Sequence, residues 1–365
     1  MKVIAQTAAL QEALGLAGGI VAARTPKPVL RCVKLVAAEG VLTVLATDLE
    51  VGCRQQVAAV EVQEEGEALV PADRLNGIVR ESGDQESLTL QTDKQLLHVR
   101  GAASHFQIYG YDPGEYPAVA EFGDAPALEL PAAALTSMIG KTLFATARVH
   151  SHYAMSGILW EADGKKLKLV ATDGHRLAQA KGGLSKAAPA AAQAIAPTKL
   201  MSLLQRLADG EQTVEVRFEE NQILVRSAHV VLVSSLVQGN FPKYEDVIPR
   251  ECTCKATFNT SQFEHRLRQA ALLTDEQSRG VKLNFQERAV TLSSRAPEAG
   301  EAEVSCPVEF EGDPLEIAFN PTFVLDALRV IETDEAVLEM NAAGKPAVVK
   351  SGSDFLYVLM PVDLS

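Results

Sequence analysis

The sequence repeats itself at an interval of about one third of its length. The segment Leu42–Asp48 (Leu-Thr-Val-Leu-Ala-Thr-Asp) returns 125 positions later as Leu167–Asp173, and Gly114–Pro117 returns at the same interval as Gly239–Pro242. A third marker is a proline just before a helical pattern of apolar residues. It occurs in residues 71–80, 197–207 and 321–330. An interval of this size is typical of an independent domain, not of a solenoid or propeller repeat. The sequence therefore predicts one domain used three times.

Within each third, the apolar patterns predict a helix, strands, a second helix and further strands. Helical spacing predicts first helices over 7–24, 131–148 and 260–272, and Thr260 and Ser261 are the expected N-caps of the last of these. The three proline-marked segments are the expected second helices. Alternating runs such as Val214–Phe218 predict half-buried strands, and Tyr357–Pro361 predicts an edge strand. We therefore expect an α+β fold of three tandem domains, each with two helices packed on β-sheets, over residues 1–122, 123–248 and 249–365.

Composition narrows the class of protein. With 47% hydrophobic residues, each third can bury roughly two-thirds of its unfolded surface and fold without a disulfide or a metal ion. The five cysteines are odd in number and scattered, and the first residues lack a signal-peptide layout, so we expect a reducing, cytoplasmic location. No apolar run approaches the roughly 18 residues that span a bilayer, and we expect a soluble protein without membrane partners.

The net charge of −13, taken alone, argues against binding to nucleic acid, because DNA-binding domains usually carry a basic excess. The placement of charge changes this expectation. Counted with Glu81 and Glu332 just past the ends of two of them, the six predicted helices carry ten basic and six acidic residues, so they sum to +4 while the rest of the chain sums to −17. Helices that face one way could present a weakly basic surface on an acidic body. The alternative is a set of ordinary solvated helix faces of mixed charge.

The octapeptide Ala171–Ala178 (Ala-Thr-Asp-Gly-His-Arg-Leu-Ala) resembles the signature of the bacterial DNA polymerase III β subunit, the sliding clamp. Further segments resemble landmarks of that family and follow the family's order. They are Arg24 with Pro28–Leu30, Thr47–Glu50, Ser156–Leu159, Phe241–Tyr244, Arg279–Val281, Phe319–Pro321 and Val358–Pro361. The resemblance covers essentially the whole chain.

The resemblance implies a head-to-tail homodimer that closes into a ring of six domains, with helices lining a hole and sheets forming the rim. Double-stranded DNA would thread the hole and be held without regard to sequence, through loose contacts to phosphates. The implied partners are the DNA polymerase III catalytic subunit, the clamp loader, and other polymerases and repair proteins that carry short clamp-binding motifs. The implied role is that of a non-catalytic accessory subunit of DNA polymerase III without a cofactor.

The resemblance also implies three sets of site residues. A groove for partner peptides would hold leucine or phenylalanine anchors. Its residues would be Met155, Thr172, Gly174, His175, Arg176, Leu177, Pro242, Val247, Asn320, Phe323, Pro346, Val358, Met360, Pro361 and Val362. The DNA contacts would be Arg24, Arg74, Arg80, Arg148, Tyr153 and Lys199. At the dimer contact, Arg74, Ile78 and Phe106 would face Leu272, Leu273, Glu298, Glu301 and Glu303 of the other subunit.

The C-terminus departs from the family pattern. The family usually ends in Arg-Leu or a similar pair after Met-Pro, whereas this chain ends Val362-Asp363-Leu364-Ser365. An acidic residue thus replaces a basic one beside the groove. We expect partner peptides with an acidic residue near their anchors to bind more weakly here.

Other interpretations of the same residues lead to other classes of protein. Asp173 and His175 could form a metal pair or an acid and base, but their spacing is not distinctive and no second ligand cluster accompanies them. Cys252 and Cys254 lack the two-residue spacer of zinc and redox motifs. One alternative function is a metal-dependent nucleic-acid hydrolase that uses Asp48 and Asp173. Another is a paralogous or mobile-element clamp whose altered C-terminus has changed its set of partners.

Overall fold

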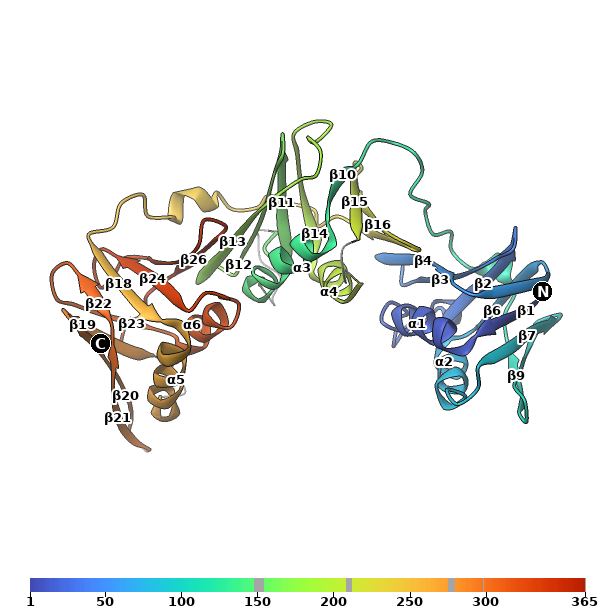
Figure 1. Ribbon diagram of the computed structural model, residues 1–365, viewed down its shortest axis with the longest axis horizontal. Coiled ribbons are helices and arrows are strands. Elements are labelled where there is room, and N and C mark those ends of the chain that lie inside the picture. Colours follow the sequence, from blue (N-terminus) through green and yellow to red (C-terminus); the bar gives the residue numbers. More distant parts are fainter. Residues whose placement is uncertain (148–153, 208–211, 275–279, 298, 365) are drawn as a thin grey trace. The chain divides into compact units, whose positions relative to one another are not determined.

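The computed structural model describes residues 1–147, 154–207, 212–274, 280–297 and 299–364. The chain forms two compact units, one of Met1–Ala133 with Ser202–Leu236 and the other of Ala134–Met201 with Val237–Ser365. Each unit contains one long and one short antiparallel sheet (Figure 1). The first repeat lies in the first unit, the third repeat lies in the second, and the elements of the middle repeat are divided between them.

The elements follow the same order in each repeat. The first repeat contains β1 (Lys2–Gln6), α1 (Thr7–Gly18), η1 (Pro28–Arg31), β2 (Cys32–Ala38), β3 (Val41–Thr47), β4 (Val51–Val57), β5 (Val60–Glu64), β6 (Gly66–Pro71), α2 (Ala72–Glu81), β7 (Ser87–Asp93), β8 (Leu96–Arg100), β9 (His105–Tyr109) and η2 (Pro113–Glu115). The second contains β10 (Leu128–Pro131), α3 (Ala132–Gly140), η3 (Leu143–Ala145), β11 (Gly157–Asp163), β12 (Lys166–Thr172), β13 (Arg176–Gly183), β14 (Ala192–Pro197), α4 (Thr198–Leu207), β15 (Thr213–Phe218), β16 (Gln222–Ser227), β17 (Val230–Ser235) and η4 (Tyr244–Val247). The third contains β18 (Cys254–Asn259), α5 (Thr260–Ala270), η5 (Ala271–Leu273), β19 (Val281–Gln286), β20 (Ala289–Ala296), β21 (Gly300–Pro307), β22 (Glu309–Glu311), β23 (Leu315–Phe319), α6 (Pro321–Leu328), β24 (Glu335–Met340), β25 (Ala347–Ser351) and β26 (Phe355–Leu359).

Strand pairing is also the same in each repeat. The strand before the first helix pairs with the strand after the second helix, as β1 with β7, β10 with β15 and β18 with β24. The strands after the first helix form an antiparallel meander, β2–β3–β4, β11–β12–β13 or β19–β20–β21. The three tandem α+β domains predicted from the sequence repeat are therefore confirmed.

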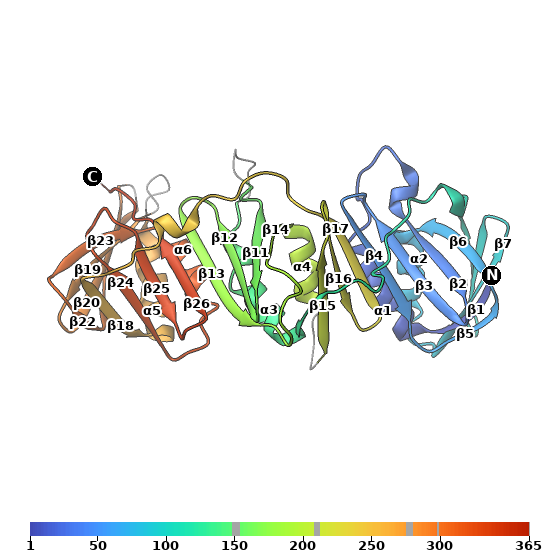
Figure 2. The same cartoon turned by 90° about the horizontal axis from the view of Figure 1, so that it is seen from above.

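Neighbouring repeats are joined edge to edge. The last meander strand of the first repeat, β4, pairs with the last strand of the second, β17, and β13 pairs in the same way with β26 (Figure 2). These pairs build the eight-stranded sheet of one unit and the nine-stranded sheet of the other. The corresponding strands at the two ends of the pattern, β21 and β9, are edge strands of the short sheets.

The repeated Thr-Asp dipeptide makes the same hydrogen bonds in the turns Thr47–Val51 and Thr172–Arg176. In each turn the threonine Oγ1 donates to the carbonyl oxygen four residues on and accepts from the N–H two residues on. The aspartate Oδ1 accepts from the N–H groups two and three residues on. These bonds are local, so the similar sequences give the same turn in both repeats.

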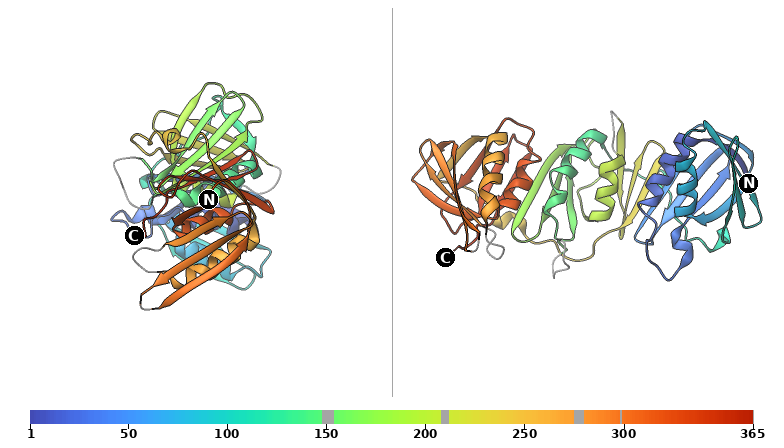
Figure 3. Two further views of the ribbon diagram at one scale, coloured as in Figure 1. Left: turned by 90° about the vertical axis from the view of Figure 1, so that its left-hand side faces the viewer. Right: turned by 90° about the horizontal axis from the view of Figure 1, so that it is seen from below.

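The helices cover one face of the sheets. In the first unit α1 and α2 lie side by side (Figure 3, right) and bury Leu10, Leu14 and Leu75. In the second unit α5 and α6 are likewise in contact. Phe263 of α5 stacks on Phe258 of β18 with ring centroids 4.3 Å apart. The apolar stripes that predicted these helices are thus the sides that face the core.

The helix ends and one cap differ from the sequence predictions. The helix predicted over 7–24 ends at Gly18, because consecutive glycines favour termination, and the one predicted over 131–148 ends at Gly140. The N-cap of α5 is Asn259, whose side chain accepts from the Gln262 N–H at 3.0 Å, and neither Thr260 nor Ser261 takes this place. Thr260 instead donates its hydroxyl to the Thr333 carbonyl oxygen.

Two strand predictions were also wrong. Each repeat begins with a short strand before its first helix, which the predicted helix–strands–helix order left out. The terminal strand β26 is not an edge strand, because it pairs with β13 on one side and with β25 on the other. Pairing by β26 ends at Leu359, just before Met360 and Pro361.

Candidate functional site

All fifteen predicted groove residues fall in the second unit, and the turn Thr172–Arg176 carries four of them. Gly174 has φ +89°, a conformation that residues with a side chain rarely adopt. The equivalent residue of the first repeat is Leu49, which holds φ +81° and is 55% exposed. The His175 carbonyl oxygen accepts from the Met360 N–H at 2.9 Å. The turn is thereby attached to the C-terminal segment.

Arg176 is buried and joins three elements. Its Nε donates to Asp173 Oδ2 (3.0 Å), its Nη1 to Asp326 Oδ2 of α6 (2.7 Å) and its Nη2 to the Phe144 carbonyl oxygen of η3 (2.7 Å). The side chain is 8% exposed. Burial would lower the pKa of Arg176, but Tyr357 and the two carboxylates outweigh this effect and raise it. Arg176 is therefore a fixed cation within the fold.

Helix α6 brings an aromatic side chain to the same place. Asn320 caps the helix by accepting from the Thr322 N–H at 3.0 Å, and Pro321 occupies the first turn. The Phe323 ring stacks on His175 at 6.4 Å and lies 4.4 Å from the Arg176 guanidinium. His175, Arg176 and Phe323 therefore come together, and Asn320 caps the helix that carries Phe323.

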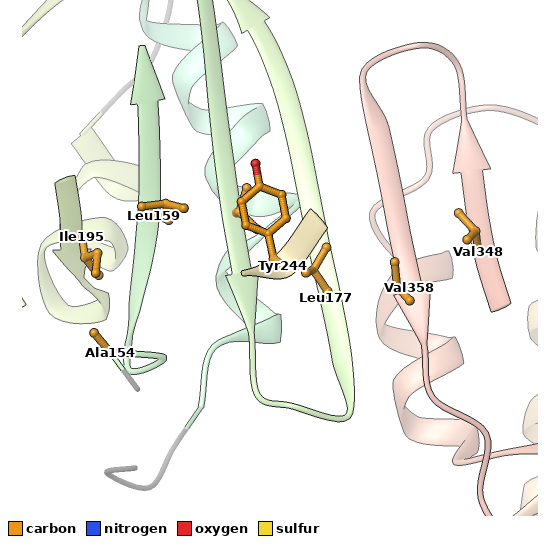
Figure 4. Close-up of a cluster of buried hydrophobic side chains, with 8 residues drawn as sticks. Ala154, Leu159, Leu177, Ile195, Tyr244, Val348 and Val358 are labelled. Carbon is orange, nitrogen blue, oxygen red and sulfur yellow. The ribbon is translucent and has the colours of Figure 1, made fainter. Parts of the chain in front are cut away.

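Beside this turn lies a buried apolar cluster (Figure 4). We call it the groove cluster, and its members are Ala154, Leu159, Val170, Leu177, Ile195, Tyr244, Val348 and Val358. Leu177 and Val358 are direct partners across β13 and β26. Two larger apolar side chains near the cluster in sequence are exposed, Val247 at 44% and Met360 at 37%. Both residues belong to the groove set that the family resemblance implies.

The C-terminal segment crosses from β26 to β23. The Val362 N–H donates to the Ala318 carbonyl oxygen at 2.9 Å, and the Leu364 side chain packs against Gly280. A hollow of about 620 Å³ lies along this segment, and Met360, Pro361 and Val362 line one side of it. Of the remaining predicted groove residues, Met155 is in the turn before β11 and Pro346 precedes β25.

The first junction between repeats lacks this surface. Residues 125 positions before Leu177, Val247 and Met360 are Gly52, Phe122 and Ser235. Val119 packs against the open side of Gly52, and Phe122 is 3% exposed between two arginine side chains. The linker of the first repeat thus covers its junction at the positions of Gly52 and Phe122, while Leu49, in the turn that precedes β4, is exposed.

The predicted DNA-contact and dimer residues are placed as follows. Arg24, Arg74 and Arg80 are exposed and Lys199 is half-buried, while Arg148 and Tyr153 lie outside the described residues. Phe106 is 39% exposed on the edge strand β9, and Ile78 is half-buried on α2. Leu272 is 81% exposed, Leu273 is half-buried, and Glu301 and Glu303 lie exposed on the edge strand β21. Glu298 lies outside the described residues.

Nothing in the described residues supports the metal-dependent interpretation. Both oxygens of Asp173 are engaged by its own turn and by Arg176. Within the described ranges, no group of three or more His, Cys, Asp or Glu side chains could hold a metal ion. All five cysteines are free thiols. In the same part of the chain, no helix is both long and apolar enough to cross a membrane.

Sequence reasoning missed Asp326, Phe144 and Tyr244. Asp326 and Phe144 hold Arg176, and Tyr244 belongs to the groove cluster. Tyr244 lies inside the Phe241–Tyr244 landmark, which was the available signal. Asp326 and Phe144 carry no signal, because their roles depend on which strands and helices meet in the fold.

Three copies of one α+β domain, joined through shared sheet edges and with one apolar surface at the second junction, define a clamp-type protein. Family models of the DNA polymerase III beta subunit match along the chain: the N-terminal domain at residues 1–120, the central domain at 129–243 and the C-terminal domain at 245–363. The chain belongs to the DNA polymerase III beta subunit family, the beta sliding clamps. This is a family of non-catalytic processivity factors, so the chain is not an enzyme.

Relatives and solved structures agree with this assignment. The beta sliding clamp of Vibrio cholerae is 32% identical over 358 residues, which cover 97% of this chain and 96% of that protein. That of Pseudomonas aeruginosa is 31% identical over 362 residues, 98% of this chain and 99% of that protein. The crystal structure of the Pseudomonas aeruginosa subunit has a TM-score of 0.94 at 31% identity and covers all of both chains. A second structure from that organism, bound to griselimycin, has a TM-score of 0.94 at 30% identity and equal coverage.

Proposed function

We propose that this sliding clamp closes around duplex DNA as a head-to-tail homodimer and tethers its partners through the apolar surface at the second junction. The partners are the DNA polymerase III catalytic subunit and other polymerases and repair proteins with short clamp-binding motifs. A clamp loader opens and closes the ring. The protein works on double-stranded DNA in the cytoplasm, without a cofactor.

Two strands with an unpaired outer edge, β21 and β9, support the proposed dimer. Two junctions pair the last meander strand of one repeat with the last strand of the next, β4 with β17 and β13 with β26. The remaining strands of each kind, β21 and β9, have one open side. Pairing of β21 in one copy with β9 in a second copy continues the pattern, and two such contacts close the assembly. Closure also removes edges that otherwise promote aggregation.

The side chains on these two edges are complementary. The β9 edge presents Phe106 and Tyr109, which are 39% and 84% exposed, together with His105. The β21 edge presents Glu301 and Glu303. A hydrogen bond between the imidazole and a carboxylate across the two edges would favour one register of pairing.

The DNA contacts are weak and directed at phosphates. The helices α1 to α6, as the structure bounds them, carry six basic and five acidic residues, a net +1 on a chain of net −13, and the proposed contacts are Arg24, Arg74, Arg80, Arg148, Tyr153 and Lys199. Contacts to phosphate carry no sequence information and weaken as salt concentration rises. Topological closure, not affinity, keeps such a ring on DNA. A modest positive charge therefore suits a protein that slides.

The partner surface takes a short apolar peptide. Leu177 and Val358 form its floor, Val247 and Met360 its exposed apolar walls, and His175 one polar side. The remaining groove residues predicted from the sequence complete this surface. A leucine or phenylalanine anchor would bury its side chain on the groove cluster, while the polar groups orient the peptide backbone.

The test is the mass in solution by light scattering, followed by retention on circular and linearised DNA after loading. We expect a dimer of twice 39.1 kDa that stays on circles and slides off linear ends. A monomer, or retention that does not depend on DNA ends, would contradict the topological mechanism.

The acidic C-terminus, with Asp363 and Leu364 after Val362, favours a second candidate: a paralogous clamp with a changed set of partners. Binding of a Gln-Leu-Ser-Leu-Phe peptide separates the two. A general clamp binds this peptide, and a clamp with a changed set of partners does not.

A further inference from the structure

Tyr244 is the one buried residue of the segment 237–250, which leads from β17 to the third repeat. It is 3% exposed, and its ring lies in the groove cluster with Leu177 and Val358 (Figure 4). Phe241 packs edge-on against the same ring, with centroids 6.3 Å apart. The segment is therefore held to the sheet by an aromatic side chain in its middle.

The Tyr244 hydroxyl is fixed by an ion pair on the sheet. It donates to Glu161 Oε2 at 2.6 Å and accepts from Lys168 Nζ at 2.8 Å, and these two charged groups are 2.9 Å apart. Glu161 and Lys168 lie directly opposite each other on β11 and β12, so the strand register sets their spacing. Burial and then the Glu161 carboxylate raise the pKa of Tyr244, which keeps the phenol a donor.

This attachment lies between two walls of the proposed peptide groove. Pro242 is two residues before Tyr244, and Val247 is three residues after it in the turn η4. Upstream, the segment is attached to its unit where the Val237 N–H donates to the Ile195 carbonyl oxygen and Asn240 accepts from the Ala154 N–H. Downstream, Val247 is 44% exposed. Phe241 and Ile248 of the same segment also pack on the cluster, and Tyr244, buried between them, adds the hydrogen bonds that fix the height of both walls.

The linker after the first repeat also contains a buried, hydrogen-bonded tyrosine, Tyr116, but this residue does not belong to the proposed groove. The Tyr116 hydroxyl donates to the Cys32 carbonyl oxygen at 3.2 Å and accepts from the Thr47 N–H at 2.9 Å. It is 7% exposed and lies in the first unit, whereas the groove residues lie in the second. Loss of either hydroxyl removes two hydrogen bonds from a buried tyrosine in a linker, so Tyr116 is a matched control.

We infer that Tyr244, held by Glu161 and Lys168, is a positioning residue for the partner-peptide groove. The inference rests on the proposed function. The Tyr244 side chain is buried and does not touch the peptide. It affects binding by holding Pro242 and Val247, which do, in place. When the hydroxyl is removed, the segment spends part of its time displaced, and the apparent affinity for peptide falls in proportion to the population that stays in place.

The experiment measures binding of a labelled Gln-Leu-Ser-Leu-Phe peptide to the full-length protein by fluorescence anisotropy. Tyr244→Phe keeps the ring in the cluster and removes only the hydroxyl. We expect it to raise the Kd about threefold to tenfold, which corresponds to the net contribution of about one hydrogen bond. Tyr116→Phe should leave the Kd within about twofold of the parent. Thermal unfolding of both variants shows whether their losses of stability are comparable.

A double-mutant cycle tests whether the ion pair acts through the hydroxyl. Glu161→Gln should weaken peptide binding, and the combination with Tyr244→Phe should bind no more weakly than Tyr244→Phe alone. An unchanged Kd for Tyr244→Phe, or an equal loss in Tyr116→Phe, would overturn the inference and leave the groove standing. If the parent protein fails to bind the peptide, the proposed general partner surface is overturned together with this inference, and the second candidate, a clamp with a changed set of partners, is favoured.

Discussion

Replacement of Arg176 by methionine is the perturbation whose effect the structure defines most closely. The change keeps an unbranched apolar stem and removes the guanidinium. That group is 8% exposed and donates to Asp173, Asp326 and the Phe144 carbonyl oxygen at 3.0, 2.7 and 2.7 Å. One substitution thus removes the hydrogen bonds that connect three elements of the second unit, and it leaves two carboxylates without the cation that they share.

The expected cost follows from the burial of these groups. Breaking a buried ion pair by removing one partner costs about 3–5 kcal/mol. The lower end applies here because both carboxylates keep other partners. Asp173 accepts two N–H groups of its own turn, Asp326 keeps Arg329 at 3.1 Å, and the two side chains are 17% and 18% exposed. We therefore expect Arg176→Met to cost about 3 kcal/mol.

Amide hydrogen exchange of the β13–β26 ladder measures this cost locally. A loss of about 3 kcal/mol corresponds to a roughly hundredfold fall in protection. The matched control is Arg226→Met, which breaks a two-bond pair with Glu215 whose side chains are 38% and 29% exposed. Exposed pairs contribute about 0–1 kcal/mol, so protection of the β15–β16 ladder should fall less than about fivefold. Equal protection losses in the two variants would refute the assignment of Arg176 as a buried link.

Three further predictions concern the surfaces and the core. Leu273→Asp should convert the dimer into a monomer of 39.1 kDa in sedimentation equilibrium, since it buries an unpaired charge at the proposed contact; an unchanged dimer would place the interface elsewhere. Replacing Met360 and Pro361 together with alanine should weaken peptide binding at least tenfold in calorimetric titration while the dimer persists. If the dimer is lost instead, these residues do not belong to the groove. Burial raises the pKa of the Cys53 thiol to about 12, so at pH 8 the thiol stays protonated and unreactive. Iodoacetamide should therefore label Cys53 only in the unfolded protein, and rapid labelling of the folded protein would contradict its burial.

Local sequence determined what could be predicted. The Thr-Asp turns recur because their hydrogen bonds lie within five residues, and all six helices lie where apolar spacing placed them. The α5 cap shows the limit of this reasoning. Asn259, Thr260 and Ser261 are all good caps, and the choice among them depends on Thr333, which is far away in sequence.

Long-range pairing determined what could not be predicted. The terminal strand was expected at an edge, but β13 of another repeat covers its second side, which fits its continuous apolar run Phe355–Leu359. Arg176 was read from the family pattern as a groove residue, and the structure shows a buried cation whose partners come from η3 and α6. No spacing in the sequence brings Phe144, Asp173 and Asp326 together. The domain limits and the roles of the groove, DNA and dimer residues stay predictions.

The junctions between repeats differ in whether they join parts of one chain or, in the proposed ring, two chains, and this difference determines how the ring can open. The junctions β4–β17 and β13–β26 lie within one chain, so separated edges meet again at an effective concentration on the order of millimolar. The proposed ring has two β21–β9 junctions, and when one of them opens the other still holds the two chains together, so this junction also re-pairs within one assembly. Only the loss of both junctions separates the chains and makes closure depend on how much protein is present. Under this proposal one seam can open to admit DNA while the assembly stays intact, and dilution favours complete dissociation instead.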